Sequence, residues 1–175
     1  MPIYVDLDGT LIGTDTLVES VRDAVRRRPW ALLLLPFYLA GGRAAFKKRL
    51  AAISQIDAAG LPYRSEVVEY LRAEKARGRT IVLATAAFRS IAEPVASYLG
   101  LFDDVIATEG KENLKGRAKL DAIRRHAGTQ DFIYMGDSMA DLPILRGARA
   151  GILVHPSRRL REAAASSCNI ERVFG

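Results

Sequence analysis

Four acidic residues, one threonine and two lysines occupy positions in this 175-residue chain where functional side chains often meet. Each of them follows an apolar segment with the character of a buried strand, or lies at the start of a helical segment between two such strands. Because open α/β sheets bind ligands at the carboxyl ends of their strands, we expect these side chains to converge on one edge of a sheet. The residues are Asp6, Asp8, Thr85, Lys115, Lys119, Asp137 and Asp141.

Clustered carboxylates need a compensating cation. They repel one another, and without a positive charge some of them would be driven to protonate. Ligands that are all oxygen favour a hard ion, and a site that keeps several waters suits Mg²⁺. A carboxylate can also attack a phosphoryl group as a nucleophile, and a metal ion with a lysine would offset the charge of phosphate beside carboxylate. The residue types therefore predict a Mg²⁺ site that handles phosphate.

The elements that would position these residues alternate between strand and helix. Short apolar segments, typical of strands buried on both faces, lie at 3–7, 80–85, 104–108, 132–136 and 151–154. Helical patterns lie at 66–77, 90–99, 116–127, 141–147 and 157–165, and we expect the second of these to be distorted or restarted at Pro94. This alternation predicts an α/β fold: a mostly parallel sheet with helices on both faces.

The region 13–65 interrupts the alternation just after the first strand. Its pattern is helical throughout, so we expect a small all-helical cap inserted into a core formed by residues 1–12 and 66–175. Within the cap, the apolar run 30–40 follows three arginines and contains Pro36. The run is too short to span a membrane. It fits either a buried cap helix or a segment that lies on an anionic membrane surface.

Four motifs of the chain resemble those of the haloacid dehalogenase superfamily. The sequence DLDGT at 6–10 matches the DxDGT signature, and Thr85 at a strand end resembles the second motif. The sequence GRAK at 116–119 resembles the third motif, a lysine at a helix start, and GDSMAD at 136–141 matches the fourth, GDxxxD. All four occur in the family's order. The resemblance implies a Rossmann-like core, and the early insertion resembles the cap of the phosphoserine-phosphatase-like subgroup.

The resemblance also implies a role for each residue in a Mg²⁺-dependent phosphatase. Asp6 would be the nucleophile that forms an aspartyl-phosphate, and Asp8 would be the general acid and then the general base. Mg²⁺ would be held by Asp6, by the backbone carbonyl of Asp8 and by Asp137, with Asp141 bound directly or through water. The groups that would hold the phosphate oxygens belong to Thr10, Thr85, Ala86 and Lys119.

Some assignments stay open at this point. Lys119 fits the third motif, but Lys115 lies close to it in the sequence. Arg89 follows the second motif and either reaches a substrate anion or is a solvated surface residue. Asp8 argues for phosphate-ester hydrolysis, because dehalogenases of the family lack this second acid. A phosphomutase or a phosphotransferase would use the same two acids.

A finer resemblance is to the phosphatase-like domain found fused to UbiA-type membrane prenyltransferases. It rests on VDLDGTLIGTDTLVES, on LLLLPFYLAGGRAAFKKRLA and on ATEGKENLKGRAKLDAI. It implies a small phosphorylated substrate, either a metabolite or a lipid-linked intermediate. It also allows an accessory role in contact with an anionic membrane or a membrane prenyltransferase. The sequence leaves open whether the chain is a stand-alone protein or a domain of a larger one.

The composition narrows the class of protein further. A hydrophobic content of 49% with 26% charged residues excludes a disordered chain. The single cysteine, Cys168, excludes an internal disulfide, and the N-terminus lacks a signal-peptide pattern, so we expect a cytoplasmic location with or without membrane association. The formal net charge is +6, but the basic residues are scattered and no binding motif accompanies them. We therefore expect no nucleic-acid partner.

Overall fold

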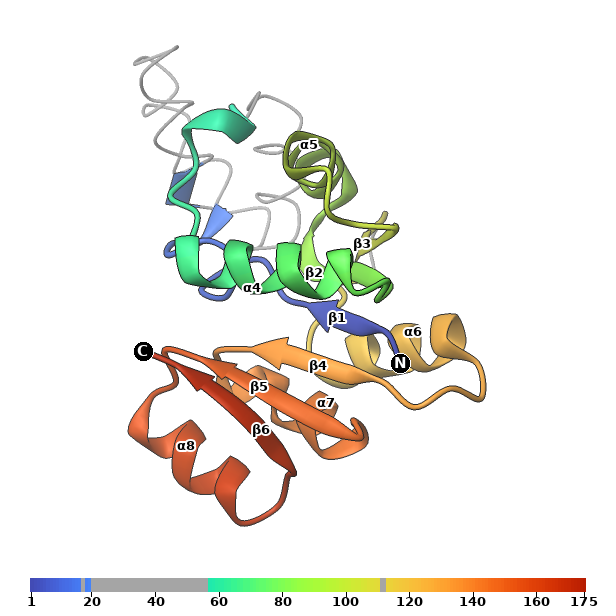
Figure 1. The fold of residues 1–175 in the computed structure, drawn as a ribbon, viewed down its shortest axis with the longest axis vertical. Coiled ribbons are helices and arrows are strands. Elements are labelled where there is room, and N and C mark those ends of the chain that lie inside the picture. The colour runs from blue at the N-terminus through green and yellow to red at the C-terminus, as the bar shows by residue number, and fades with distance from the viewer. Residues whose placement is uncertain (17, 20–56, 111–112) are drawn as a thin grey trace, which may run out of the picture.

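The computed structural model describes residues 1–16, 18–19, 57–110 and 113–175. Its centre is a parallel sheet of six strands in the order β3-β2-β1-β4-β5-β6 (Figure 1). The strands are β1 (Ile3–Val5), β2 (Ile81–Phe88), β3 (Asp104–Thr108), β4 (Ile133–Gly136), β5 (Ala150–Val154) and β6 (Ile170–Phe174). The described residues form five α-helices, α4 (Ser65–Ala76), α5 (Arg89–Leu99), α6 (Arg117–Ala127), α7 (Leu142–Gly147) and α8 (Arg158–Ala165), with 3-10 turns η2 (Ala58–Gly60) and η3 (Met139–Asp141).

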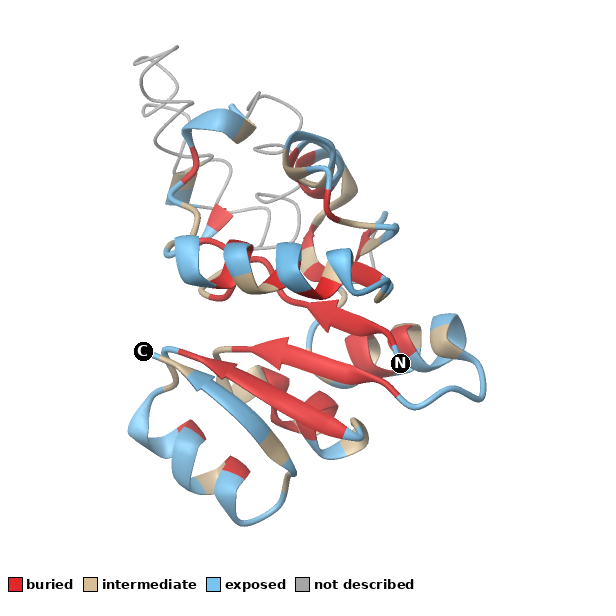
Figure 2. Cartoon of the chain, in the orientation of Figure 1, coloured by how far each residue is buried: buried red, intermediate tan, exposed pale blue. Residues whose placement is uncertain are grey.

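Successive residues of the strands face two separate hydrophobic cores. In β1, Ile3 and Val5 pack in the core that holds α4 and α5. Tyr4 between them packs in the core that holds α6, α7 and α8. Helices therefore cover both faces, which confirms the predicted α/β fold. The strands β1, β4 and β5 are buried, whereas β6 is largely exposed (Figure 2). Burial on both faces explains why the central strands are almost continuously apolar.

The chain changes direction across the sheet at β1. Strands β2 and β3 lie on one side of β1, and β4, β5 and β6 lie on the other side. At such a switch point the connections beyond the carboxyl ends of the two central strands run in opposite directions and leave a crevice. Asp6 and Asp8 follow β1, and Asp137 follows β4. The topology alone therefore brings the first and fourth motifs together.

Three elements differ from the sequence-based prediction. Helix α5 is a single helix that contains Pro94, so the predicted restart there is wrong, whereas the alternative of a distorted helix stays a prediction. Pro94 is exposed, while Ile91 and Val95 anchor the helix in the core, so packing outweighs the one backbone hydrogen bond that proline cannot make. Strand β6 was not predicted, because most of its residues are exposed and it lacks the apolar run of a buried strand. Strand β2 also extends to Phe88, beyond Thr85.

The two ends of the predicted cap lie side by side. The amide of Gly13 donates to the carbonyl of Pro62 at 2.9 Å, and the amide of Arg64 donates to the carbonyl of Leu11 at 3.0 Å. This pairing is what an insertion between 13 and 65 requires. Residue 17 and residues 20–56, with the apolar run 30–40, lie outside the described residues, so the helical cap stays a prediction. Within the described part of the chain, no helix is both long and apolar enough to cross a membrane.

Candidate active site

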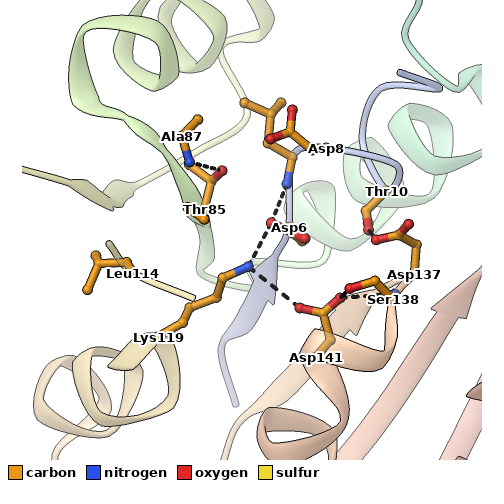
Figure 3. Close-up of polar contacts among 12 residues, drawn as sticks. Asp6, Asp8, Thr10, Thr85, Ala87, Leu114, Lys119, Asp137, Ser138 and Asp141 are labelled. Atoms are coloured by element: carbon orange, nitrogen blue, oxygen red, sulfur yellow. Dashed lines mark hydrogen bonds and ion pairs between the residues drawn. The ribbon is translucent and has the colours of Figure 1, made fainter. Parts of the chain in front are cut away.

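A cavity of about 420 Å³ opens at the carboxyl ends of β1 and β4. It holds most of the side chains that the sequence singled out, and these come from four separate segments of the chain (Figure 3). Thr10 and Thr85 are fully buried, Thr10 in the loop after β1 and Thr85 within β2. The predicted residues that line the cavity are Asp6, Asp8, Ala86, Lys115, Lys119, Asp137 and Asp141.

Asp6 directly follows β1, and its carboxylate is buried, with 8% of the residue's surface exposed. Its Oδ1 atom accepts hydrogen bonds from the amide of Leu7 at 2.9 Å and from Lys119 Nζ at 2.8 Å. No described residue donates to Asp6 Oδ2, so this oxygen has no competing partner among them. Burial raises the pKa of Asp6 to about 7, Lys119 opposes this rise, and the neighbouring Asp141 adds to it. The carboxylate therefore gains from any further positive charge.

The loop after β1 fixes the Asp8 carboxylate and packs against Asp137 through its next two residues. Asp8 Oδ1 accepts a hydrogen bond from the amide of Thr16 at 2.6 Å, and Asp8 Oδ2 accepts one from the hydroxyl of Thr16 at 3.2 Å. Gly9 has a φ of +76°, and a Cβ atom at this position would overlap the carboxylate of Asp137. The hydroxyl of Thr10 donates to Asp137 Oδ1 at 3.3 Å. A glycine is therefore required between Asp8 and Thr10 on grounds of both backbone conformation and space.

Three carboxylates in the cavity are placed as ligands of one cation would be. Oxygen atoms of Asp6, Asp137 and Asp141 all lie within 4.8 Å of one another. Burial and the nearby Asp141 raise the pKa of Asp137 to about 6. The donor set is all oxygen and carries an excess of negative charge, which fits Mg²⁺. The side chain of Asp8 is not part of this cluster, and a metal contact of its backbone carbonyl stays a prediction.

Burial and contact distinguish the two candidate lysines. Lys119 is 3% exposed, and its Nζ atom lies 2.8 Å from Asp6 Oδ1 and 3.6 Å from Asp141 Oδ1. Burial alone would lower the pKa of Lys119, but Asp6 and Asp141 raise it above its ordinary value, so the side chain stays charged. Lys115 is exposed at the rim of the same cavity. The position next to Asp6 therefore belongs to Lys119.

The second motif contributes a hydroxyl and a turn of backbone beside the cavity. The Thr85 hydroxyl oxygen accepts a hydrogen bond from the amide of Ala87 at 2.9 Å, and Ala86 lines the cavity. The Ala86 carbonyl accepts a hydrogen bond from the hydroxyl of Thr108 at 2.9 Å. Thr108, at the end of β3, was not singled out from the sequence. It joins the ends of two neighbouring strands and holds the second motif in place.

Arg89 does not line the cavity. Its guanidinium forms ion pairs with Glu93 and Glu109, and it borders a different hollow of about 360 Å³ together with Asp104 and His126. The sequence offered a substrate contact and a solvated surface arginine as alternatives for this residue. The structure pairs the guanidinium with two glutamates outside the cavity, and a substrate contact by Arg89 stays a prediction.

Tyr134 is a polar residue of the site that the sequence analysis missed. It is fully buried in β4, and its hydroxyl accepts a hydrogen bond from Lys119 Nζ at 3.1 Å and donates one to Asp141 Oδ1 at 2.7 Å. A tyrosine within the predicted buried strand 132–136 was a usable sequence signal, because a buried tyrosine hydroxyl must find a hydrogen-bond partner. Its place two residues before Gly136 puts it on the face of the sheet that α6 covers.

The fold and the site together define a class of protein: a parallel-sheet enzyme with a buried carboxylate–lysine pair beside a cluster of carboxylates. The chain belongs to the haloacid dehalogenase-like hydrolase family, whose model matches residues 3–146. The matched range contains all four motifs. This family assignment agrees with the order of the four motifs in the sequence.

Individual relatives agree with this membership. The chain is 40% identical over 168 residues to an uncharacterized protein of Sinorhizobium fredii, covering 93% of this chain and 32% of that protein. It is 28% identical over 116 residues to a probable phosphatase of Mycobacterium tuberculosis, covering 58% of this chain and 40% of that one. A substrate-bound phosphoserine phosphatase structure shares the fold, with a TM-score of 0.66 at 17% identity and coverage of 98% and 91%.

The chain spans about a third of the length of the first curated relative and two fifths of the second. These similarities do not bear on a fusion to a prenyltransferase, which stays a prediction.

Proposed function

We propose that the protein is a Mg²⁺-dependent phosphomonoester hydrolase that acts through an aspartyl-phosphate on Asp6. The observation that carries the proposal is the pairing of Asp6 with Lys119 at 2.8 Å beside the cluster formed with Asp137 and Asp141. The probable phosphatase among the relatives and the fold shared with phosphoserine phosphatase support the same reaction class. The substrate is a small phosphorylated molecule that fits a cavity of about 420 Å³.

In the first half of the reaction, an oxygen of the Asp6 carboxylate attacks the phosphorus atom. The bond from phosphorus to the leaving oxygen breaks, and Asp8 gives its proton to that oxygen. In the second half, Asp8 accepts a proton from a water molecule that attacks the same phosphorus, and the bond to Asp6 breaks. The two hydrogen bonds from Thr16 hold the Asp8 carboxyl in a fixed orientation for both transfers.

Mg²⁺ would be held by the carboxylates of Asp6 and Asp137 and by the backbone carbonyl of Asp8, with Asp141 bound directly or through water. When bound, it supplies positive charge that offsets the phosphoryl group and the carboxylates. Lys119 supplies a second positive charge at Asp6 Oδ1. Thr10, Thr85 and the backbone at Ala86 would bind the phosphate oxygens that face away from the nucleophile. Preorganised donors of this kind stabilise charge that develops in the transition state.

The direct test compares turnover of p-nitrophenyl phosphate by the wild type, by Asp6→Asn and by a matched control. We expect turnover that stops on chelation and returns with Mg²⁺. Asp6→Asn should lower it by about 10³-fold or more, because an amide is a poor nucleophile. The control is Asp121→Asn, which removes an exposed carboxylate of α6 that does not line the cavity. Turnover that survives Asp6→Asn or that ignores chelation would refute the proposal.

A further inference from the structure

The Tyr134 hydroxyl lies between two charged groups of the site. Lys119 Nζ donates to it at 3.1 Å, and it donates in turn to Asp141 Oδ1 at 2.7 Å. All three residues are buried, and Tyr134 is fully inaccessible. A neutral hydroxyl between a buried ammonium and a buried carboxylate satisfies both groups without joining them directly.

The Lys119 ammonium group lies near two carboxylates, those of Asp6 and Asp141, and it is closer to Asp6. Its Nζ atom lies 2.8 Å from Asp6 Oδ1 and 3.6 Å from Asp141 Oδ1. Asp141 is occupied by other donors: Oδ1 accepts from Tyr134, and Oδ2 accepts from the amide of Ser138 at 3.1 Å and from its hydroxyl at 2.9 Å. Because both oxygens of Asp141 already accept hydrogen bonds, the Lys119 ammonium group donates to Asp6 and not to Asp141.

The packing around Tyr134 leaves the hydroxyl little freedom to move. A Cβ atom on Gly136 would lie 2.8 Å from Tyr134 Cε1 and 2.9 Å from Asp141 Cγ. The absence of a side chain at Gly136 therefore allows the ring and the carboxylate to approach each other. The ring also lies beside the ammonium group, with Nζ 5.7 Å from its centroid. A phenylalanine would keep this ring contact and lose only the hydroxyl.

We propose that Tyr134 is a positioning residue: its hydroxyl occupies Asp141 and thereby holds the Lys119 ammonium on Asp6. The link to catalysis rests on the proposed function, whereas the structural part stands without it. If the hydroxyl is removed, Asp141 Oδ1 loses its donor and Lys119 loses an acceptor. Both are buried and of opposite charge, so the ammonium moves toward Asp141 and away from the nucleophile.

The sequence provides a matched control for the variant Tyr134→Phe. Tyr4 is the register partner of Tyr134 on the adjacent strand, is equally buried, and faces the same core. Its hydroxyl makes a hydrogen bond of 2.8 Å to His126 Nδ1, away from the cavity. Tyr4→Phe therefore removes one hydroxyl and one hydrogen bond from the same layer of the fold, without touching Lys119 or Asp141.

The kinetic test measures kcat and KM for p-nitrophenyl phosphate with saturating Mg²⁺. We expect Tyr134→Phe to lower kcat about tenfold, since a hydrogen bond to a charged group is lost, with KM changed less than about twofold. Tyr4→Phe should change neither constant by more than about twofold, although both variants lower the urea midpoint by similar amounts. A kcat for Tyr134→Phe equal to that of the wild type, or a loss matched by Tyr4→Phe, overturns the proposal.

A crystal structure of metal-free Tyr134→Phe gives a readout that does not depend on activity. We expect Lys119 Nζ to form a direct contact with Asp141 Oδ1 and to move beyond about 3.5 Å from Asp6 Oδ1, the outer limit of a hydrogen bond. An ammonium that stays at its wild-type distance from Asp6 overturns the proposal. If the wild type does not hydrolyse phosphate esters, the proposed function fails, and this structure still decides the role of Tyr134.

Discussion

Lys115 and Lys119 are both candidates for the lysine of the third motif, and their burial distinguishes them. The sequence favoured Lys119 by its place in GRAK but did not exclude Lys115, because both lie near the same helix start. The structure separates them by burial: Lys119 is enclosed against Asp6, whereas Lys115 is exposed at the cavity rim. Which side of a helix start faces inward depends on how α6 packs, and the sequence spacing alone does not fix this.

The two lysines lead to a paired prediction. Lys119→Met removes the ammonium group that contacts the Asp6 carboxylate, so we expect kcat/KM for p-nitrophenyl phosphate to fall by about 10²–10³-fold. Lys115→Met, the matched control, should leave kcat/KM within about threefold of the wild type, because its exposed charge is screened by solvent. Steady-state kinetics of both variants check this. The opposite order of effects would assign the motif lysine to Lys115.

At the scale of elements, the sequence predicted the buried strands well and the exposed ones poorly. The apolar run before Asp137 was sufficient to predict β4, because a strand buried on both faces has to be apolar. Strand β6 has no such run, and only its pairing with β5 shows that it is a strand. The reverse error occurred at Pro94, where a local breaker was given more weight than the buried residues on either side.

Pro94 therefore lowers the stability of helix α5, and a substitution can remove this effect. Pro94 is exposed inside the helix, so Pro94→Ala should restore a backbone hydrogen bond without loss of packing. We expect the free energy of unfolding to rise by about 1 kcal/mol, less than the full helix penalty of proline because proline also restricts the unfolded chain. Urea denaturation measures the change.

The control for Pro94→Ala is Gly100→Ala at the end of the same helix. Gly100 has a φ of +62° and no atom within 4 Å of an added Cβ, so alanine there adds only backbone strain. We expect it to lower the free energy of unfolding by about 1 kcal/mol. A loss of stability in Pro94→Ala would show that the proline fits α5 better than alanine does.

At the scale of the whole molecule, the net charge and the site have opposite signs. The chain carries a formal charge of +6, yet the cavity gathers the carboxylates of Asp6, Asp8, Asp137 and Asp141. The positive charge therefore lies mainly outside the cavity, where it would attract the anionic substrate of the proposed reaction toward a site whose charge bound Mg²⁺ would offset. Topology explains why the acids gather, because β1 and β4 end at the switch point of the sheet.

The acidic site predicts how the stability of the metal-free protein depends on pH. The pKa of Asp6 is raised to about 7 and that of Asp137 to about 6. The folded protein therefore binds these protons more tightly than the unfolded chain. Their stabilisation is complete below about pH 4, the pKa of an unperturbed aspartate, and is lost as the pH rises through the two raised values.

Urea denaturation in a chelator tests this pH dependence. From Asp6 alone we expect a fall of about 2–3 kcal/mol in the free energy of unfolding between about pH 5 and pH 8. Asp6→Asn should remove most of this fall, and Mg²⁺ should restore stability at the higher pH by binding only the folded state. A free energy that does not change with pH, or the same slope in Asp6→Asn, would contradict the raised pKa of Asp6.

The central claim is that Asp6 carries the phosphoryl group during turnover. The most direct measurement quenches the wild type during turnover of a phosphomonoester with Mg²⁺, reduces it with borohydride and maps the product by peptide mass spectrometry. An acyl phosphate is reduced to the alcohol, so we predict homoserine at position 6 only when substrate and Mg²⁺ are both present. Turnover without any modified residue 6, or with the modification on another acid, would contradict the account.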